Sequence, residues 1–277
     1  MTDRQTRGSQ VLRPRALTIA GSDSGGGAGI QADLKTFSAL GVFGMTAITA
    51  VTVQNTKGVS GFEELSPTTV ADQIRAVVGD IGVDAAKTGM LASAAIVEAV
   101  AEAAAETQLP LIVVDPVSVS KHGHPLLADD AVDALRRLLL PLATLVTPNL
   151  PEAAGLAGFE VSTPDDMRRA GAAILALGPR AVLVKGGHLE GDRARDLFAD
   201  GSGEEWIDAE RIDTPHTHGT GCTLSAAIAA HLARGVSLPV AVREGKDFVT
   251  EAIRHALPLG NGIGPVDQLW PIDRPAG

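Results

Sequence analysis

The chain of 277 residues carries 33 aspartates and glutamates against 23 lysines and arginines, a net charge of −10 at pH 7. Hydrophobic residues make up 45% of it and aromatic residues only 3%. This is the composition of an ordinary soluble protein, and it excludes nucleic acid as an expected partner because basic charge and stacking side chains are both scarce. The single cysteine excludes an internal disulfide framework and suits a reducing cytoplasm.

The first 15 residues are polar and rich in arginine, so we expect a flexible tail there and no secretory signal. No apolar run reaches the ~18 residues that a membrane-spanning helix needs, so no membrane partner is expected. No linker, low-complexity block or repeat divides the rest of the chain, which predicts a single domain over 16–277.

Short apolar segments alternate with helical patterns along the whole domain. Residues 16–20 read as a strand, a glycine-rich run breaks it at 21–29, and 30–40 have apolar residues at helical spacing. Further strands are predicted at 45–53, 84–87, 111–114, 144–146 and 181–184. Further helices are predicted at 67–78, 93–106, 130–140, near 151, and at 164–177, 222–233 and 239–256, with a hairpin-like stretch at 196–207.

This alternation predicts an α/β fold with a central, mostly parallel sheet flanked by helices on both faces. In such a sheet, ligands bind beyond the carboxyl ends of the strands. The polar residues that follow strands are therefore the candidates for function.

The only cysteine closes a glycine turn, Thr217-His218-Gly219-Thr220-Gly221-Cys222, and a helical pattern follows at once. Two glycines around a threonine before a helix allow successive backbone N–H groups to point at an anion. The helix start also favours the thiolate form of a cysteine, which makes Cys222 a candidate base. The alternative is a buried structural cysteine at the start of a helix.

Two candidate binding segments follow the first two strands. The glycine-rich run 21–29 matches a dinucleotide-binding pattern only weakly, since no acidic residue ends the next strand. It is either a flexible turn or a loop that lets the backbone approach a ligand, with Asp23 as the polar contact. Gln54 carries both a donor and an acceptor for a ring nitrogen and its amino group, unless the segment is only a turn built on Asn55 and Gly58.

Four more polar residues follow later strands. Asp115 suits Mg²⁺ or its waters, or else an Asp turn before proline. Asn149 and Glu152 are spaced as a helix capping box, or they lie near a magnesium–phosphate group. Lys185, before two glycines, either reaches a phosphate or is a solvated strand-end lysine. The absence of a Walker sequence and of zinc-ligand spacing disfavours an ordinary NTPase and a structural zinc site.

In their order along the chain, these segments resemble those of the bacterial hydroxymethylpyrimidine/phosphomethylpyrimidine kinases of thiamine biosynthesis, in the ribokinase-like superfamily. The matching segments are 16–23, 26–36, 53–56, 87–91, 147–153, 185–188 and 216–225. The resemblance implies an enzyme that uses ATP and Mg²⁺ to phosphorylate 4-amino-5-hydroxymethyl-2-methylpyrimidine and then its monophosphate. It also implies a cytoplasmic homodimer.

For the pyrimidine, the resemblance implies that Gln54 reads the aminopyrimidine edge and that Met90 lies against the ring, with Gly21 and Asp23 also at the substrate. For ATP, it implies that Lys185 contacts the phosphates.

The remaining implied roles concern the reacting phosphate. The resemblance places Asn149 and Glu152 near the metal–phosphate group, with Glu152 and Asp115 holding Mg²⁺ mostly through water. Gly219, Thr220, Gly221 and Cys222 would form the anion hole.

Sugar kinases of the superfamily carry aspartate as the base where this chain has Cys222. For Cys222 to act as a thiolate base at neutral pH, the helix start and Lys185 must lower the pKa of its thiol. Two alternatives stay open, a pyridoxal kinase of the same superfamily and a non-catalytic regulator that binds the pyrimidine.

Overall fold

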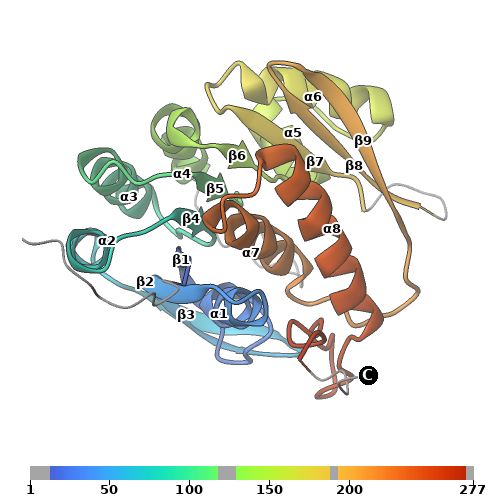
Figure 1. The fold of residues 1–277 in the computed structure, drawn as a ribbon, viewed down its shortest axis with the longest axis horizontal. Helices are drawn as coiled ribbons and strands as arrows, with labels where there is room; N and C mark the ends of the chain where they lie inside the picture. Colours follow the sequence, from blue (N-terminus) through green and yellow to red (C-terminus); the bar gives the residue numbers. More distant parts are fainter. Residues whose placement is uncertain (1–12, 118–128, 188–192, 273–277) are drawn as a thin grey trace, which may run out of the picture.

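The computed structural model describes residues 13–117, 129–187 and 193–272 (Figure 1). In this part of the chain, nine strands form one sheet in the order β3-β2-β1-β4-β5-β6-β7-β8-β9. The strands are β1 (Arg15–Ser22), β2 (Phe43–Asn55), β3 (Gly58–Glu64), β4 (Ala85–Thr88), β5 (Ile112–Val114), β6 (Leu145–Val146), β7 (Ala181–Lys185), β8 (Arg193–Asp200) and β9 (Gly203–Glu210). The six strands from β2 to β7 in this order pair in parallel, and antiparallel strands complete both edges.

Helices cover both faces of this sheet. They are α1 (Gly29–Ala39), α2 (Pro67–Asp80), α3 (Ala94–Glu106), α4 (Asp129–Ala134), α5 (Leu150–Ala157), α6 (Pro164–Leu175), α7 (Thr220–Ala233) and α8 (Leu238–Arg254). A π-helical turn, Leu135–Leu139, extends α4. Helices α1, α7 and α8 pack on one face, and α2 to α6 pack on the other (Figure 1). The predicted layered α/β architecture is confirmed.

Alternation along β1 explains the two cores. Leu17 and Ile19 point into the core under α2 to α6, whereas Ala16 points into the core under α1, α7 and α8. The central strands are buried on both faces, which is why Ile112–Val114 reads as an unbroken apolar run. Sequence alone therefore located these strands well.

Two differences from the expected elements concern the edges of the fold. The strand β3 was not predicted, because this edge strand is largely exposed and its sequence lacks a clear apolar alternation. The strand β1 begins at Arg15, the last residue of the expected tail, whose side chain pairs with Asp84 at 2.8 Å. Residues 1–12 of that tail lie outside the described residues.

The helices of the described ranges include none that combines the length and the apolar character required to cross a bilayer. Their boundaries follow from local signals instead. For α2, the Ser66 hydroxyl accepts the N–H of Thr69 at 3.1 Å and Pro67 occupies the first turn. This start agrees with the predicted one.

Candidate active site

A cavity of about 760 Å³ opens at the carboxyl ends of the parallel strands. Its lining includes every candidate residue named from the sequence: Gly21, Asp23, Gln54, Met90, Asp115, Asn149, Glu152, Lys185, Gly219, Thr220, Gly221 and Cys222. These residues come from segments up to two hundred positions apart, and the sheet order brings them together. His188, in the segment after Lys185, lies outside the described residues.

The glycine turn before α7 is shaped by Gly219. Its φ of +84° lies in the left-handed region, and a Cβ added there would collide with the carbonyl oxygen of Gly27. The Thr220 hydroxyl closes the turn by donating to the carbonyl of Thr217 at 2.8 Å. Because the first N–H groups of a helix have no acceptor within it, this turn presents backbone donors to an anion in the cavity.

The environment of Cys222 differs from the expected one. Burial raises the pKa of its thiol to about 11, although the Lys87 ammonium and the backbone N–H of Gly29, which donates to the sulfur, both favour the thiolate. Asp33 and Asp115 oppose it further. The lowered pKa that a thiolate base requires at neutral pH is therefore not observed, because desolvation outweighs the helix start and the nearby cation.

Lys185 is held between two carboxylates. Its Nζ lies 2.9 Å from Asp115 Oδ1 and 3.8 Å from Glu152 Oε2. Burial opposes its charge, but the two carboxylates outweigh burial and raise the pKa of Lys185, so the ammonium stays charged. The side chain is only 14% exposed, which excludes the solvated strand-end lysine.

Asp115 is fixed as firmly as its partner. Its Oδ1 accepts from Lys185 and from the Thr147 hydroxyl at 3.2 Å, and its Oδ2 accepts from the Ser225 hydroxyl at 3.2 Å. Burial opposes its charge, but Lys185 and Lys87 outweigh burial and lower the pKa of Asp115. It is thus an ionised anchor for Lys185.

Asn149 and Glu152 form the predicted capping box at the start of α5. The Asn149 side chain accepts the N–H of Glu152 at 2.9 Å, and the Glu152 carboxylate accepts the N–H of Asn149 at 2.8 Å. Because both residues also line the cavity, the capping role and a ligand role do not exclude each other.

The carboxylates at this end of the cavity suit a hard cation. Glu152 and Asp115 supply oxygen donors of the kind that Mg²⁺ prefers, and a single ammonium leaves the pair with a net negative charge. No group of three or more acidic, histidine or cysteine side chains gathers as a direct metal cage in the described ranges. The donor set therefore fits a magnesium ion held mostly through water and phosphate.

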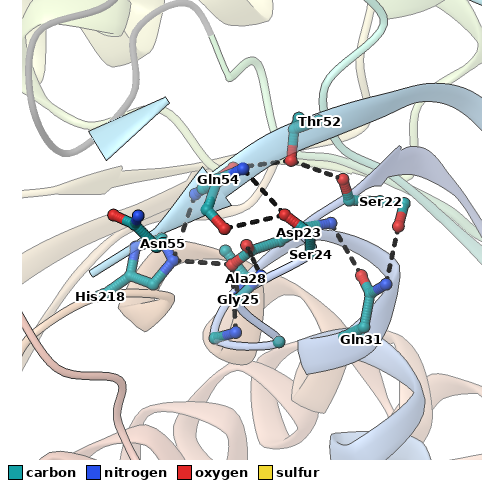
Figure 2. A network of polar contacts seen from close by, with 12 residues as sticks. Ser22, Asp23, Ser24, Gly25, Ala28, Gln31, Thr52, Gln54, Asn55 and His218 are labelled. Carbon is teal, nitrogen blue, oxygen red and sulfur yellow. Dashed lines mark hydrogen bonds and ion pairs between the residues drawn. The ribbon is translucent and has the colours of Figure 1, made fainter. Parts of the chain in front are cut away.

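The glycine-rich loop is organised around Asp23 (Figure 2). Its carboxylate accepts the N–H groups of Gly25 at 2.8 Å, Gly27 at 3.1 Å and Ala28 at 2.8 Å. It also lies 2.8 Å from His218 Nε2. Burial opposes its charge, but these contacts outweigh burial and lower the pKa of Asp23. The loop is therefore an ordered turn, and Asp23 shapes it from within.

Gln54 faces this loop from the end of β2 (Figure 2). Its backbone N–H donates to the Ser24 hydroxyl at 2.8 Å, and that hydroxyl donates back to the Gln54 carbonyl at 2.8 Å. Its side-chain oxygen accepts from Thr52 at 3.1 Å, and its side-chain nitrogen lies 3.4 Å from His218 Nε2. The expected turn also exists, since β2 and β3 form a hairpin at Asn55. Gln54 thus lines the cavity and also lies beside the turn.

Gly21 and Met90 lie side by side on the wall of the cavity. A Cβ added at Gly21 would be 3.1 Å from the Met90 sulfur. The small residue thus leaves the thioether of Met90 in place against the cavity.

Sequence reasoning gave no role to His218 or to the buried pair of Lys87 and Asp33. The pair did leave a signal: Asp33 lies three residues after Ile30 and four before Phe37, within the apolar stripe of α1. A charge in such a stripe requires a buried partner. His218 left no comparable signal, because its contact with Asp23 spans 195 positions.

The segment after α8 makes hydrogen bonds to the two loops of the site. The N–H of His218 donates to the carbonyl of Gly264 at 3.1 Å. The buried amide of Gln268 donates to the carbonyl of Gly27 at 3.3 Å and lies 3.2 Å from the Thr223 hydroxyl. The glycine-rich loop and the start of α7 are thus held by the same C-terminal segment.

Comparison with known proteins agrees with this geometry. A family model described as phosphomethylpyrimidine kinase matches residues 23–267. A hydroxymethylpyrimidine/phosphomethylpyrimidine kinase of Streptomyces coelicolor is 60% identical over 262 residues, which cover 95% of this chain and 97% of that protein.

Two solved structures are similar over most of the chain. A Bacillus subtilis pyridoxal kinase in complex with ADP has a TM-score of 0.87 and 44% identity, covering 92% of this chain and 97% of its own. A phosphomethylpyrimidine kinase from Clostridium difficile has a TM-score of 0.78 and 46% identity, covering 87% of this chain and 100% of its own.

The ribokinase-like fold and the kinase function expected from the sequence are confirmed by these likenesses. The matched region contains residues 23–29 of the glycine-rich loop, Lys185 and the glycine turn with Cys222. This chain belongs to the phosphomethylpyrimidine kinase family.

Proposed function

We propose that this chain transfers the γ-phosphoryl group of ATP to 4-amino-5-hydroxymethyl-2-methylpyrimidine, and then a second phosphoryl group to the monophosphate. The observation that carries the proposal is the meeting, in one cavity, of an amide suited to the ring, a buried ammonium and a backbone anion cradle. The names of the relatives support the same two substrates.

Gln54 binds the aminopyrimidine edge in this proposal. An amide offers one acceptor and two donors, which match an exocyclic amino group and the adjacent ring nitrogen. The Thr52 hydroxyl holds the amide oxygen of Gln54 and Ser24 holds its backbone, so that little rotational freedom is lost on binding. Met90 packs against the ring, and Gly21 and Asp23 form the wall beside it.

The phosphate end is bound by charge and by backbone donors. Lys185 contacts the phosphates of ATP, and the N–H groups from Gly219 to Cys222 bind the group in transfer. Phosphoryl transfer passes through a loose transition state, so orientation and charge stabilisation supply most of the rate. Asn149 and Glu152 line the same cavity, and in this proposal they are on its nucleotide side.

Magnesium would be held by Glu152 and Asp115, mostly through water, and would neutralise charge on the phosphates. Both carboxylates already face Lys185, so the protein fixes the position of its own cation independently of the metal.

Cys222 is the proposed acceptor of the hydroxyl proton. With a pKa of about 11 the thiol is neutral in most molecules at neutral pH, so the thiolate acts as a minority form. Proton transfer to it takes place late in a loose transition state, when the hydroxyl oxygen has begun to bond to phosphorus.

A pyridoxal kinase is the rival enzyme, since the solved B. subtilis relative carries that name. The curated relative at 60% identity carries the pyrimidine kinase name, which favours the pyrimidine. A non-catalytic regulator would need neither the buried Lys185 nor the backbone cradle beside Cys222.

The test is a substrate panel with Mg-ATP, in which the two pyrimidines and pyridoxal are compared at equal concentration and products are identified by mass. The proposal expects kcat/KM for both pyrimidines to exceed that for pyridoxal. Faster use of pyridoxal would assign the chain to the rival activity, and ATP turnover that no acceptor stimulates would support a regulator.

A cytoplasmic homodimer is part of the proposal. Met45, Ala47 and Ala50 of β2 belong to one core, and beyond the register shift between Ile48 and Val51 the side chains of Val51 and Val53 lie on the opposite face, where they are 47% and 64% exposed. A second copy would cover these valines. Light scattering checks the expected doubled mass, and Val53→Glu should yield monomers if this face is the contact.

A further inference from the structure

Lys87 and Asp33 form an ion pair that the proposed reaction leaves without a role. Both side chains are 0% exposed, and Lys87 Nζ lies 2.9 Å and 3.1 Å from the two carboxylate oxygens. The Thr18 hydroxyl donates to the same carboxylate at 2.6 Å. Because apolar residues of similar volume often stabilise a fold as well as a buried ion pair does, stability alone does not account for it.

The pair lies close enough to Cys222 for both of its charges to act on the thiol. Lys87 and Cys222 line the same cavity. Gly29, whose N–H donates to the Cys222 sulfur, is four residues before Asp33 in α1, so both face the same side of that helix. The lack of a side chain at Gly89 makes room for the ammonium, since a Cβ there would be 2.8 Å from Lys87 Nζ.

We propose that Lys87 is a positioning residue for Cys222: its buried ammonium stabilises negative charge on the sulfur, and Asp33 both holds that ammonium and limits its effect. The inference rests on the proposed role of Cys222 as a base.

Four charged groups interact with the thiol, and because their charges differ in sign, removing one or another should shift the pKa of the thiol in opposite directions. Lys87 favours the thiolate, whereas Asp33 and Asp115 oppose it. Lys185 also interacts with Cys222, but it is held by Asp115 and Glu152. Removal of Lys87 should therefore raise the pKa of the thiol, and removal of the Asp33 charge should lower it.

Alkylation measures this directly. Cys222 is the only cysteine, so the mass added by iodoacetamide reports the thiolate fraction without substrate or ATP. Across pH 7 to 10, Lys87→Met should slow alkylation by about tenfold or more, the equivalent of one pKa unit, and Asp33→Asn should accelerate it. If the pair is only structural, both variants loosen the site and change the rate in the same direction, which would overturn the proposal.

Two further variants keep the test decisive. Asp33→Asn combined with Lys87→Met removes both charges and keeps the shapes, so it should fold even where a single variant does not. It should react more slowly than wild type, because Lys87 outweighs Asp33 at the thiol; an unchanged profile would overturn the proposal. Lys246→Met is the matched control, since it breaks another buried pair, with Asp196 at 2.6 Å, and should leave alkylation unchanged.

The same variants separate this inference from the proposed reaction. If alkylation follows the predicted order but the pH profile of the kinase does not shift with it, the base role of Cys222 is refuted while the effect of Lys87 on the thiol stands. If both profiles shift together, both are supported.

Discussion

Cys222→Ser should change how the rate of phosphoryl transfer depends on pH, not only the rate itself. Serine keeps the helix start and the backbone N–H, but its hydroxyl does not ionise in the accessible range. With a pKa of about 11, the wild-type thiol is ionised in about one molecule in 10⁴ at pH 7 and in about one in 10² at pH 9. If only the thiolate accepts the proton, the wild-type rate rises about tenfold per pH unit across this range.

The wild-type rate divided by the rate of Cys222→Ser, at the same pH, isolates the effect of the thiolate. Titration of ATP and its magnesium complex affects wild type and variant alike, so it cancels when one rate is divided by the other. Single-turnover phosphorylation of the pyrimidine alcohol should be followed from pH 6 to pH 9, with ATP affinity measured in both proteins. We expect the ratio to grow across the whole range and to reach about 10² or more at pH 9.

Two results would contradict this reasoning. A ratio that stays constant with pH would leave Cys222 a structural part of the anion hole, with no titrating role. A ratio that levels off near pH 8.5 would show that the thiol has its ordinary pKa during turnover, and that burial does not raise it there.

Four other changes have expected outcomes. Gln54→Ala should lower kcat/KM for the pyrimidine by the equivalent of ~1–3 kcal/mol with the fold intact; an unchanged kcat/KM would remove Gln54 from the site. Lys185→Ala should slow transfer to the alcohol and to the monophosphate by about 10² or more, since both steps use ATP; a loss with only one acceptor would indicate a substrate contact instead. Gly219→Ala should lower Tm and weaken ATP binding, because its Cβ meets the Gly27 carbonyl, whereas Gly221→Ala, with no atom nearer than 3.4 Å, should keep the wild-type Tm; equal melting of the two would contradict the collision. Finally, the pKa of the Cys222 thiol is raised on folding, so its stabilising contribution is complete below about pH 9 and is lost as pH rises toward about 11; denaturant titrations of wild type and Cys222→Ser should diverge only in that window.

Sequence alone predicted most strands, the helices and the twelve candidate residues that line the cavity, because these features depend on local patterns. Buried strands read as apolar runs, and polar residues at their ends mark the site. The exposed strand β3 left no such pattern.

The charge state of the site could not be predicted in the same way. Desolvation of Cys222 depends on how completely α1, β4 and α7 enclose it, and the cation beside it, Lys87, comes from a strand more than a hundred residues away. The helix start was visible in the sequence and the burial was not, so the raised pKa of the thiol could not be predicted.

The C-terminal segment has a consequence for how the enzyme is made. Gly264 holds the backbone of His218, and Gln268 joins the glycine-rich loop to the start of α7. On the ribosome, the sheet strands and α7 emerge before these two residues, so the glycine-rich loop and the start of α7 lack these contacts until residue 268 has emerged. A nascent chain that already contains Lys185 and Cys222 should therefore fail to retain ATP, and binding competence should arise only when residue 268 has left the exit tunnel.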